Sequence, residues 1–126
     1  MPKKLHFVVH DHKARQHHFD FRLEMNGVLK SWVIPKRIDT KNLYEKRLAV
    51  QVEDHTLEYG SFKGTIPEGQ YGAGKVSIWD SGSYEIVDNK PNKKIVFRLN
   101  GKKLKGEFVL VHFKPEGNQW LFFKKK

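Results

Sequence analysis

Residues 19–34 of the chain read FDFRLEMNGVLKSWVI, two strand-like runs on either side of an Asn-Gly pair. Asn26 and Gly27 tolerate positive φ angles, which suits a tight hairpin turn. In the first run apolar and polar residues alternate, and alternate side chains of a strand point to opposite faces of a sheet. The segment therefore predicts a β-hairpin whose first strand has an apolar face, which includes Phe19 and Phe21, and a polar face.

The polar face of the first run carries residue types that bind metal ions and phosphate. His18, Asp20 and Arg22 share this face, and His12 lies six residues before His18, an even offset that keeps it on the same side of an extended chain. Nitrogen with carboxylate oxygen suits manganese, zinc or ferrous iron better than magnesium or calcium. The pattern H-x5-H-x-D is a candidate metal site, and the arginine suggests a phosphate. The alternative is that these side chains only meet water, as polar strand residues more often do.

The rest of the chain contains short β-rich runs separated by Gly, Asn, Asp and Pro, which is typical of an antiparallel sandwich or barrel. Closure into a barrel would remove exposed sheet edges. We therefore predict an all-β fold, a small closed or nearly closed antiparallel barrel of about eight strands with little helix. The predicted strands are Leu5–Val9, Phe19–Met25, Val28–Ile34, Leu48–Glu53, Lys75–Trp79, Ser83–Val87, Lys94–Leu99, Glu107–Phe113 and Gln119–Phe123.

Four connections between the predicted strands contain residues that favour a particular local structure. Asp80-Ser81-Gly82 and Asn100-Gly101 carry turn-forming residues. Asp39–Glu45 is polar and lacks alternation, so it is predicted to form a short helix or turn. Gly64–Gly74 is rich in glycine but lacks the G-K-[ST] ending of a P-loop, and we expect a shaped loop with no direct catalytic role.

The length of 126 residues predicts one domain, residues 1–126, which is expected to be a monomer. The chain has no cysteine, which excludes disulfides, thiolate zinc sites and cysteine nucleophiles. No apolar stretch is long enough for a signal peptide or a membrane span. We therefore expect a cytoplasmic protein, no contact with a membrane, and any metal ion held by His, Asp or Glu.

The charge of the chain points to a polyanionic partner. Lysine and arginine number 24 against 14 acidic residues, which gives a formal charge of +10. Nucleic acid is the leading candidate, and Lys102, Lys103, Lys105 and Lys124–Lys126 are clustered cations. Trp32, Trp79 and Trp120 could stack on bases, although most are expected in the core. The alternative is that the charge only keeps a small protein soluble.

A second polar cluster lies in Arg47–His55, where apolar residues alternate with Arg47, Gln51, Glu53 and His55. Arg47 and His55 could both reach a pocket. A histidine near a bound phosphate is suited to proton transfer or oxyanion stabilisation. The alternative is a strand end with an ordinary surface histidine. Among the other imidazoles, His10 and His17 are expected to be bystanders.

Five blocks of this sequence match one family in the same order. They are F-V-V-x-x-H-x-A, H-x-D-F-R-L-E, G-V-L-K-S-W-x-x-P-K, R-L-A-V-x-V-E-D-H and I-P-E-G-Q-Y-G-A-G, and they run from about Phe7 to Trp79. This set resembles the 3′-phosphoesterase domain of bacterial ligase D and its freestanding homologues. The resemblance implies a β-barrel hydrolase that heals 3′ ends of DNA and RNA with a divalent metal, Mn²⁺ being favoured over Co²⁺ or Zn²⁺.

The same resemblance implies a reaction and its partners. A 3′-terminal ribonucleoside is removed by phosphodiesterase cleavage, and the remaining 3′-phosphate by phosphomonoesterase cleavage, which leaves a 3′-hydroxyl. The substrate would be a primer-template end in DNA repair by non-homologous end joining. Separate ligase, polymerase and Ku-type end-binding proteins would be partners, since no such module accompanies these residues.

Site residues carry over by motif position. His12, His18 and Asp20 would be metal ligands. Arg22 would bind the scissile phosphate, with His55 and Tyr59 as further catalytic groups. Arg47 and Lys36 would assist with the substrate, and Glu53 would orient these groups.

The sequence departs from the family pattern before the second ligand, where Gln16-His17-His18-Phe19 replaces R-L-H-Y. Ligase-fused members of the family have a longer N-terminal arm that can contact the active site, so the resemblance makes diester cleavage a firmer expectation than monoester cleavage. Two other classes stay open from the residues alone. One is a basic barrel that binds nucleic-acid ends without cleaving them, and the other is a cupin-like metal enzyme for small molecules.

Overall fold

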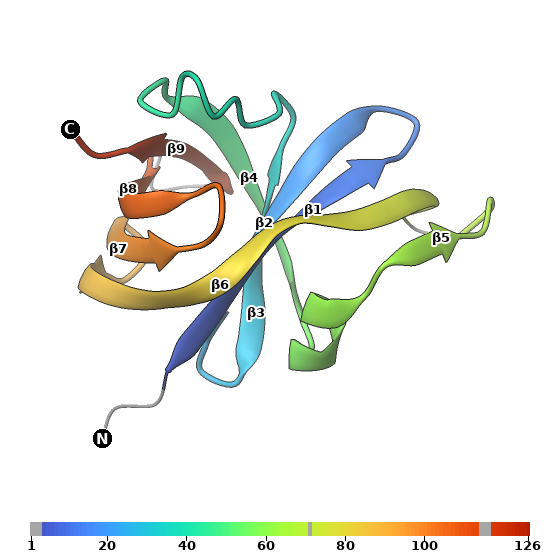
Figure 1. Cartoon of the computed structure of the whole chain (residues 1–126), viewed down its shortest axis with the longest axis horizontal. Coiled ribbons are helices and arrows are strands. Elements are labelled where there is room, and N and C mark those ends of the chain that lie inside the picture. Colours follow the sequence, from blue (N-terminus) through green and yellow to red (C-terminus); the bar gives the residue numbers. More distant parts are fainter. Residues whose placement is uncertain (1–3, 71, 114–116) are drawn as a thin grey trace.

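The computed structural model describes residues 4–70, 72–113 and 117–126. Strands in these residues form one antiparallel sheet in the order β1-β2-β3-β4-β9-β8-β7-β6-β5, and β1 also pairs with β6 (Figure 1). This pairing closes eight strands into a barrel and leaves β5 as an extra strand, which confirms the predicted fold class. The elements are β1 Leu5–Lys13, β2 His17–Met25, β3 Val28–Ile34, β4 Arg47–His55, the 3₁₀ helix η1 Leu57–Ser61, β5 Gly64–Ile66, β6 Gly74–Lys90, β7 Lys94–Asn100, β8 Lys105–His112 and β9 Gln119–Lys124.

The hairpin predicted around the Asn-Gly pair joins β2 to β3. Asn26 and Gly27 have φ angles of 55° and 81°, and the flanking Met25 and Val28 are partners in the ladder. Two positive φ angles give the turn a twist that matches the twist of the strands. The turn thereby fixes the register of the whole hairpin.

The barrel interior is filled mainly by aromatic rings. Phe21 lies at its centre, with ring centroids 5.7 Å from Phe97 and 4.9 Å from Phe122. Trp32 and Trp120 are also buried in the interior and meet edge to face at 5.8 Å. The expectation that most tryptophans belong to the core is therefore confirmed for these two.

β6 corrects one prediction, because Lys75–Trp79 and Ser83–Val87 belong to a single strand rather than to two. The residues between them do not form a turn; they allow β6 to pack closely against the end of β7 and the loop that follows it. The Asp80 carboxylate accepts backbone N–H groups of the β7–β8 loop. A Cβ on Gly82 would lie 2.2 Å from the carbonyl oxygen of Asn100, so only glycine fits there.

The connection after β4 also differs from expectation. Gly64–Ile66 pairs with Gly74–Val76, so the glycine-rich segment is a hairpin, β5 to β6, rather than only a loop. Tyr71 of this segment lies outside the described residues. In Asp39–Glu45 the chain makes turns without a helix, in agreement with one of the two predicted forms.

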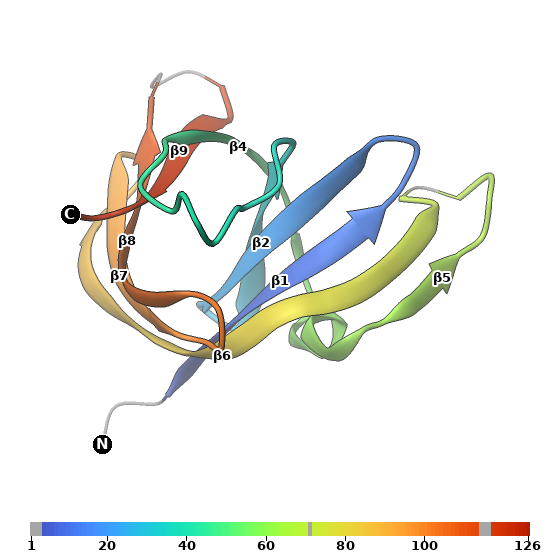
Figure 2. The same cartoon turned by 45° about the horizontal axis from the view of Figure 1, so that its top comes forward.

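The strands of the barrel lie in two groups, and the additional strand β5 lies beside only one of them. Figure 2 shows β7, β8 and β9 on one side, while β1, β2 and β6 extend to the other side, where β5 runs beside β6. On that side the carbonyl groups of Phe62 and Gly72, which lie between β4 and β6, contact the outward-facing side chains of His10 and His12 on β1. Among the described residues no helix is long and apolar enough to cross a membrane.

Candidate active site

A pocket of about 340 Å³ lies on the outer face of the barrel wall, under the segment that connects β4 to β6. β1 and β2 send even-numbered side chains to this face, because their odd-numbered partners fill the barrel interior. Six of the nine predicted site residues line the pocket: His12, His18, Asp20, Arg22, His55 and Tyr59.

The protonation of the two candidate metal-binding imidazoles follows from their backbone contacts. Nε2 of His12 lies 2.8 Å from the carbonyl oxygen of Gly72, and Nδ1 of His18 lies 3.0 Å from that of Gln16. A carbonyl oxygen can only accept, so each of these nitrogens carries the proton and donates it. Nδ1 of His12 and Nε2 of His18 are therefore left as lone pairs.

Both lone pairs face the same carboxylate. Nδ1 of His12 is 3.3 Å from Oδ2 of Asp20, and Nε2 of His18 is 3.3 Å from Oδ1. Ligand atoms of these three residues lie within 4.8 Å of one another. Two nitrogen lone pairs opposite carboxylate oxygens repel unless a proton or a metal cation lies between them. The donor set, two imidazoles whose other N–H binds a carbonyl and one carboxylate, fits a borderline divalent transition metal.

The charges around Asp20 stabilise its ionised form. Burial alone would raise the pKa of Asp20, but His18, Arg22 and His12 together hold it below its ordinary value. The same contact with Asp20 raises the pKa of His18, against the effect of burial. The carboxylate is thus charged at neutral pH and ready to bind a cation.

Arg22 is buried beside this carboxylate and is held on several sides. Its Nη2 lies 3.3 Å from Oδ2 of Asp20, and its Nη1 donates to Oγ of Ser31 at 2.8 Å. The guanidinium carbon is 4.9 Å from the centre of the Tyr59 ring. The planar guanidinium is therefore fixed at the pocket, where its fork geometry suits phosphate oxygens.

His10 is close to the site, so the expectation that it is a bystander is wrong. It is fully buried, its Nδ1 accepts a hydrogen bond from Nε of Arg22 at 3.0 Å, and its Nε2 donates to the carbonyl oxygen of Phe62 at 3.0 Å. Burial and the charge of Arg22 lower the pKa of His10 to about 4. The ring is therefore neutral at neutral pH and orients Arg22.

His55 and Tyr59 form the opposite wall of the pocket. Nδ1 of His55 lies 3.2 Å from the carbonyl oxygen of Glu53 and 3.4 Å from Nη1 of Arg22, and the His55 ring lies 4.5 Å from that of Tyr59. Burial and Arg22 lower the pKa of His55, and burial raises the pKa of Tyr59. Both groups are consequently neutral at neutral pH in the free protein.

Three predicted site residues do not line this pocket. Arg47 is buried and donates to the carbonyl oxygens of Asn42 and Arg37, at 2.9 and 3.3 Å, so it holds the β3–β4 connection. Lys36 lies on that connection, is exposed and pairs with Glu45. Glu53 is exposed, and its backbone carbonyl contacts His55.

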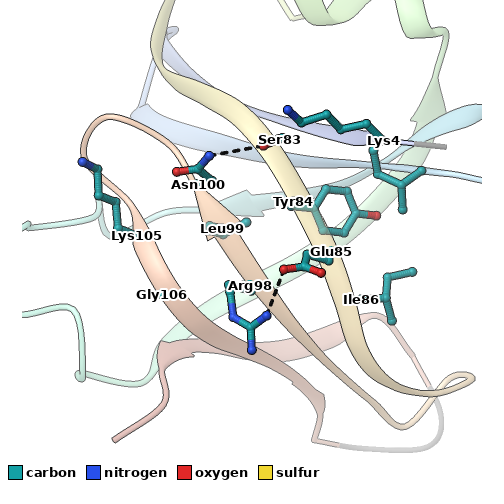
Figure 3. Close-up of a pocket in the computed structure, with 11 residues that line it drawn as sticks. Lys4, Ser83, Tyr84, Glu85, Ile86, Arg98, Leu99, Asn100, Lys105 and Gly106 are labelled. Atoms are coloured by element: carbon teal, nitrogen blue, oxygen red, sulfur yellow. Dashed lines mark hydrogen bonds and ion pairs between the residues drawn. The ribbon is translucent and has the colours of Figure 1, made fainter. Parts of the chain in front are cut away.

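A larger hollow of about 890 Å³ lies away from these residues, along β6, β7 and β8 (Figure 3). Its chemistry is different, because the described residues that line it include no group of side chains suited to hold a metal ion, and its one arginine is engaged by carboxylates. Arg98 binds Glu85 at 2.9 Å and Glu107 at 3.0 Å, and Asn100 contacts Ser83. The smaller pocket is therefore the candidate active site.

Comparisons with known proteins identify the family of this chain. The family model of the DNA ligase D 3′-phosphoesterase domain matches residues 10–112. The chain is 43% identical over 123 residues to the multifunctional non-homologous end joining DNA repair protein LigD of Mycobacterium tuberculosis, covering 95% of the chain and 16% of that protein. It is also 43% identical over 128 residues to the multifunctional non-homologous end joining protein LigD of Pseudomonas aeruginosa, covering 97% of the chain and 15% of that protein.

The chain thus spans about a sixth of the length of the curated relatives it matches. The range that the family model matches, residues 10–112, contains His12, His18 and Asp20, as well as Arg22 and His55. By the extent of the family match and the identity to these relatives, the chain belongs to the DNA ligase D 3′-phosphoesterase domain family.

Proposed function

We propose that this chain is a metal-dependent phosphoesterase that heals 3′ ends of nucleic acid during DNA repair by non-homologous end joining. It removes a 3′-terminal ribonucleoside by phosphodiester cleavage and then the 3′-phosphate, which leaves a 3′-hydroxyl for a polymerase or ligase. The formal charge of +10 supports a nucleic-acid substrate. Family membership supports the phosphoesterase class.

One observation carries the proposal: the free lone pairs of two imidazoles face one carboxylate, directly beside a buried arginine. His12, His18 and Asp20 would hold the metal ion, for which Mn²⁺ is the first choice and Co²⁺ or Zn²⁺ the next. When bound, the ion neutralises negative charge on the phosphate oxygens as a Lewis acid.

The chain's own groups would bind and orient the phosphate. Arg22 lies where its guanidinium can hold phosphate oxygens, and its contacts with His10 and Ser31 keep it in place. His55 lies on the opposite wall and is neutral, so it can donate a hydrogen bond to a phosphate oxygen or exchange a proton with the leaving group. Tyr59 holds the ring of His55 and the guanidinium of Arg22 at the same time.

The remaining predicted residues act from outside the pocket in this proposal. Lys36 and Glu53 are exposed, and Lys36 follows β3 at the end where Ile34 pairs with Phe19, next to His18. From there Lys36 can contact the nucleic-acid backbone beside the scissile phosphate. Arg47 supports this contact by holding the connection that carries Lys36.

The test is cleavage of a primer-template whose primer ends in one ribonucleotide, with Mn²⁺ present. The wild-type chain should yield a primer shorter by one nucleoside that ends first in phosphate and then in hydroxyl. Asp20→Asn should lower the rate at least about a thousandfold, because the lost ligand charge removes metal-assisted stabilisation of the phosphate. A matched control is Asp88→Asn, which removes an exposed carboxylate of β6 and should cleave like the wild type.

Metal binding gives a second readout that does not depend on activity. Mn²⁺ should raise the melting temperature of the wild type and of Asp88→Asn, but not of Asp20→Asn. Retention of the oligonucleotide without any cleavage, in Mn²⁺, Co²⁺ and Zn²⁺ alike, would contradict the proposal and leave a nucleic-acid-binding barrel.

A further inference from the structure

The wall that carries the active site has a second face with a different chemistry. Asp11 of β1 pairs with Phe19 of β2 and with Ser77 of β6, so the side chains at these paired positions point to the same side of the sheet. Lys13 and Lys75 form another pair, and their side chains point to that side too. We call this surface the reverse face and define it by Lys13, Lys75, Trp79, Lys102 and Lys103. It lies on the side of β1, β2 and β6 that faces away from the pocket.

Trp79 is placed on the reverse face by an irregularity of β6. Val9 pairs with Asp80 and His10 pairs with Ile78, which leaves Trp79 as the extra residue of a β-bulge. One side of its ring packs on Phe19, with centroids 4.8 Å apart, while the ammonium of Lys103 lies 4.5 Å from the ring centre. Of the three tryptophans, all of which the structure describes, Trp79 is the one that is not buried.

The loop that carries Lys102 and Lys103 is held in a fixed shape. The buried Asp80 carboxylate accepts the backbone N–H groups of Lys102, Lys103 and Leu104 at 2.8 to 3.1 Å. A Cβ on Gly101 would lie 2.4 Å from Oδ2 of Asp80, so the carboxylate occupies the space that a side chain would need. The two lysines are thus presented next to Trp79 by a rigid support, not by a flexible tail.

The reverse face has a net positive charge that nothing nearby neutralises. Lys13, Lys75, Lys102 and Lys103 are exposed, and none forms an ion pair with a residue that the structure describes. The acidic groups on this side are engaged elsewhere, since Asp11 pairs with His17 and Asp80 binds backbone N–H groups. A partly exposed aromatic ring flanked by lysines without acidic partners is a composition suited to single-stranded nucleic acid, whose bases stack on rings and whose phosphates attract cations.

We propose that the reverse face binds the single-stranded template overhang that continues beyond a recessed 3′ end. This inference rests on the proposed function, in which the 3′ end in the pocket is paired to a template strand. The template continues past that end without a partner strand, so its bases are free to stack. One base would stack on Trp79 in place of the Lys103 side chain, and the lysines would contact the phosphates on either side.

The position of the reverse face sets the length of overhang that it needs. The β1–β2 turn forms the rim between the two faces, and Ala14 of this turn lines the pocket. A path from His12 over the rim and back to Trp79 is about 30 Å long, from about 3.3 Å per strand residue and about 10 Å across the sheet. At about 3.4 Å per stacked nucleotide, an overhang of about nine nucleotides reaches Trp79.

Tryptophan fluorescence tests the proposal directly, because the other two tryptophans are buried. The probe is a DNA primer-template with an ordinary 3′-hydroxyl and a thymidine overhang, titrated in EDTA so that the metal site plays no part. An overhang of about fifteen nucleotides should quench the fluorescence, and one of about three should not. Trp79→Phe should lose the quenching and keep the wild-type melting temperature, since phenylalanine still packs on Phe19.

Charge variants provide the second measurement. Lys102→Ala/Lys103→Ala should weaken binding of the long overhang and reduce the slope of log affinity against log salt by about 1 to 1.5, while binding of the short overhang stays the same. The matched control, Lys90→Ala/Lys94→Ala, removes the same charge from exposed positions near the β6–β7 turn. It should bind both overhangs like the wild type.

The outcomes separate this inference from the proposed function. If Mn²⁺-dependent cleavage occurs but both overhangs quench equally, or if the double variant behaves like its control, the reverse face does not bind the overhang and the enzyme assignment stands. If the long overhang quenches selectively but no metal supports cleavage, the surface stands and the enzyme assignment fails.

Discussion

The two faces of β2 are equally buried but are held together by different forces. On one face Phe21 and Leu23 are fully buried in the barrel interior, and on the other Asp20 and Arg22 are only 5% and 3% exposed. Burial of the phenyl and isobutyl groups stabilises the fold, since it removes apolar surface from water. Burial of the charges is tolerated only because Asp20, Arg22 and the imidazoles neutralise one another.

This contrast explains how one strand can serve stability and chemistry together. Substitutions on the apolar face should lower the free energy of unfolding. The molecules that remain folded should keep the rate constants of the wild type. Substitutions on the polar face should change rate constants more than stability. The following predictions test this division, from the largest effect to the smallest.

Phe21→Ala should lower the free energy of unfolding by about 4 kcal/mol, because it leaves a cavity among Phe97 and Phe122. Urea denaturation followed by fluorescence measures this change. The exposed Phe113 provides a control, since Phe113→Ala should alter stability by less than about 1 kcal/mol. Equal effects of the two substitutions would show that the barrel interior is not the source of stability.

Arg22→Lys should lower the cleavage rate about a hundredfold, because lysine keeps the charge but cannot hold two phosphate oxygens in one plane. Its melting temperature should stay close to that of the wild type. Arg98→Lys, on the exposed surface, is the matched control and should cleave normally. A normal rate for Arg22→Lys would mean that charge alone, without the fork geometry, serves the site.

His10→Leu should lower the cleavage rate about tenfold, because Nε of Arg22 loses its acceptor and the guanidinium is free to turn. His10→Gln should restore most of the rate, since the amide oxygen can accept the same hydrogen bond. Steady-state kinetics should place the loss in kcat more than in KM. An equal loss in both variants would point to packing rather than to orientation of Arg22.

Glu85→Gln should change the free energy of unfolding by less than about 0.5 kcal/mol, although it breaks an ion pair with Arg98 at 2.9 Å. Both side chains are about half exposed or more, so water already screens their attraction. Thermal melting and the cleavage assay should both match the wild type. A large loss would mean that surface pairs, and not only the buried set around Asp20, contribute to stability.

Much of the fold follows from local patterns in the sequence. The Asn-Gly turn and the two-residue period predict the β2–β3 hairpin and both of its faces, because turn geometry sets the register and the pleat sets the direction of each side chain. The same register places Ser31 directly opposite Arg22, so this contact could have been found from the hairpin alone. His10 lies two residues before His12 on the same strand, so both side chains point to the same side of the sheet. This spacing could have indicated from the sequence that His10 belongs to the site.

Other features depend on contacts between distant parts of the chain, which local patterns do not contain. Asp80 and Gly82 resemble a turn in sequence, but they serve contacts with Asn100 and the following loop. Arg47 has a residue type suited to phosphate, yet its guanidinium holds carbonyl groups of a nearby connection. A residue type predicts which chemistry is possible, and the tertiary fold decides which partner is present.

The bulge at Trp79 has a consequence for the whole of β6. Before it, Val76 and Ile78 share the outward side of His12 and His10, whereas after it Asp80 and Tyr84 share the inward side of Val9 and Leu5. One inserted residue thus reverses the phase of a continuous strand, so that even positions switch from the outside of the wall to its inside. Deletion of Trp79 alone would leave Ile78 opposite His10 and Asp80 opposite Val9 in regular alternation, so the strand would lose its bulge while the side chains on either side kept their present faces.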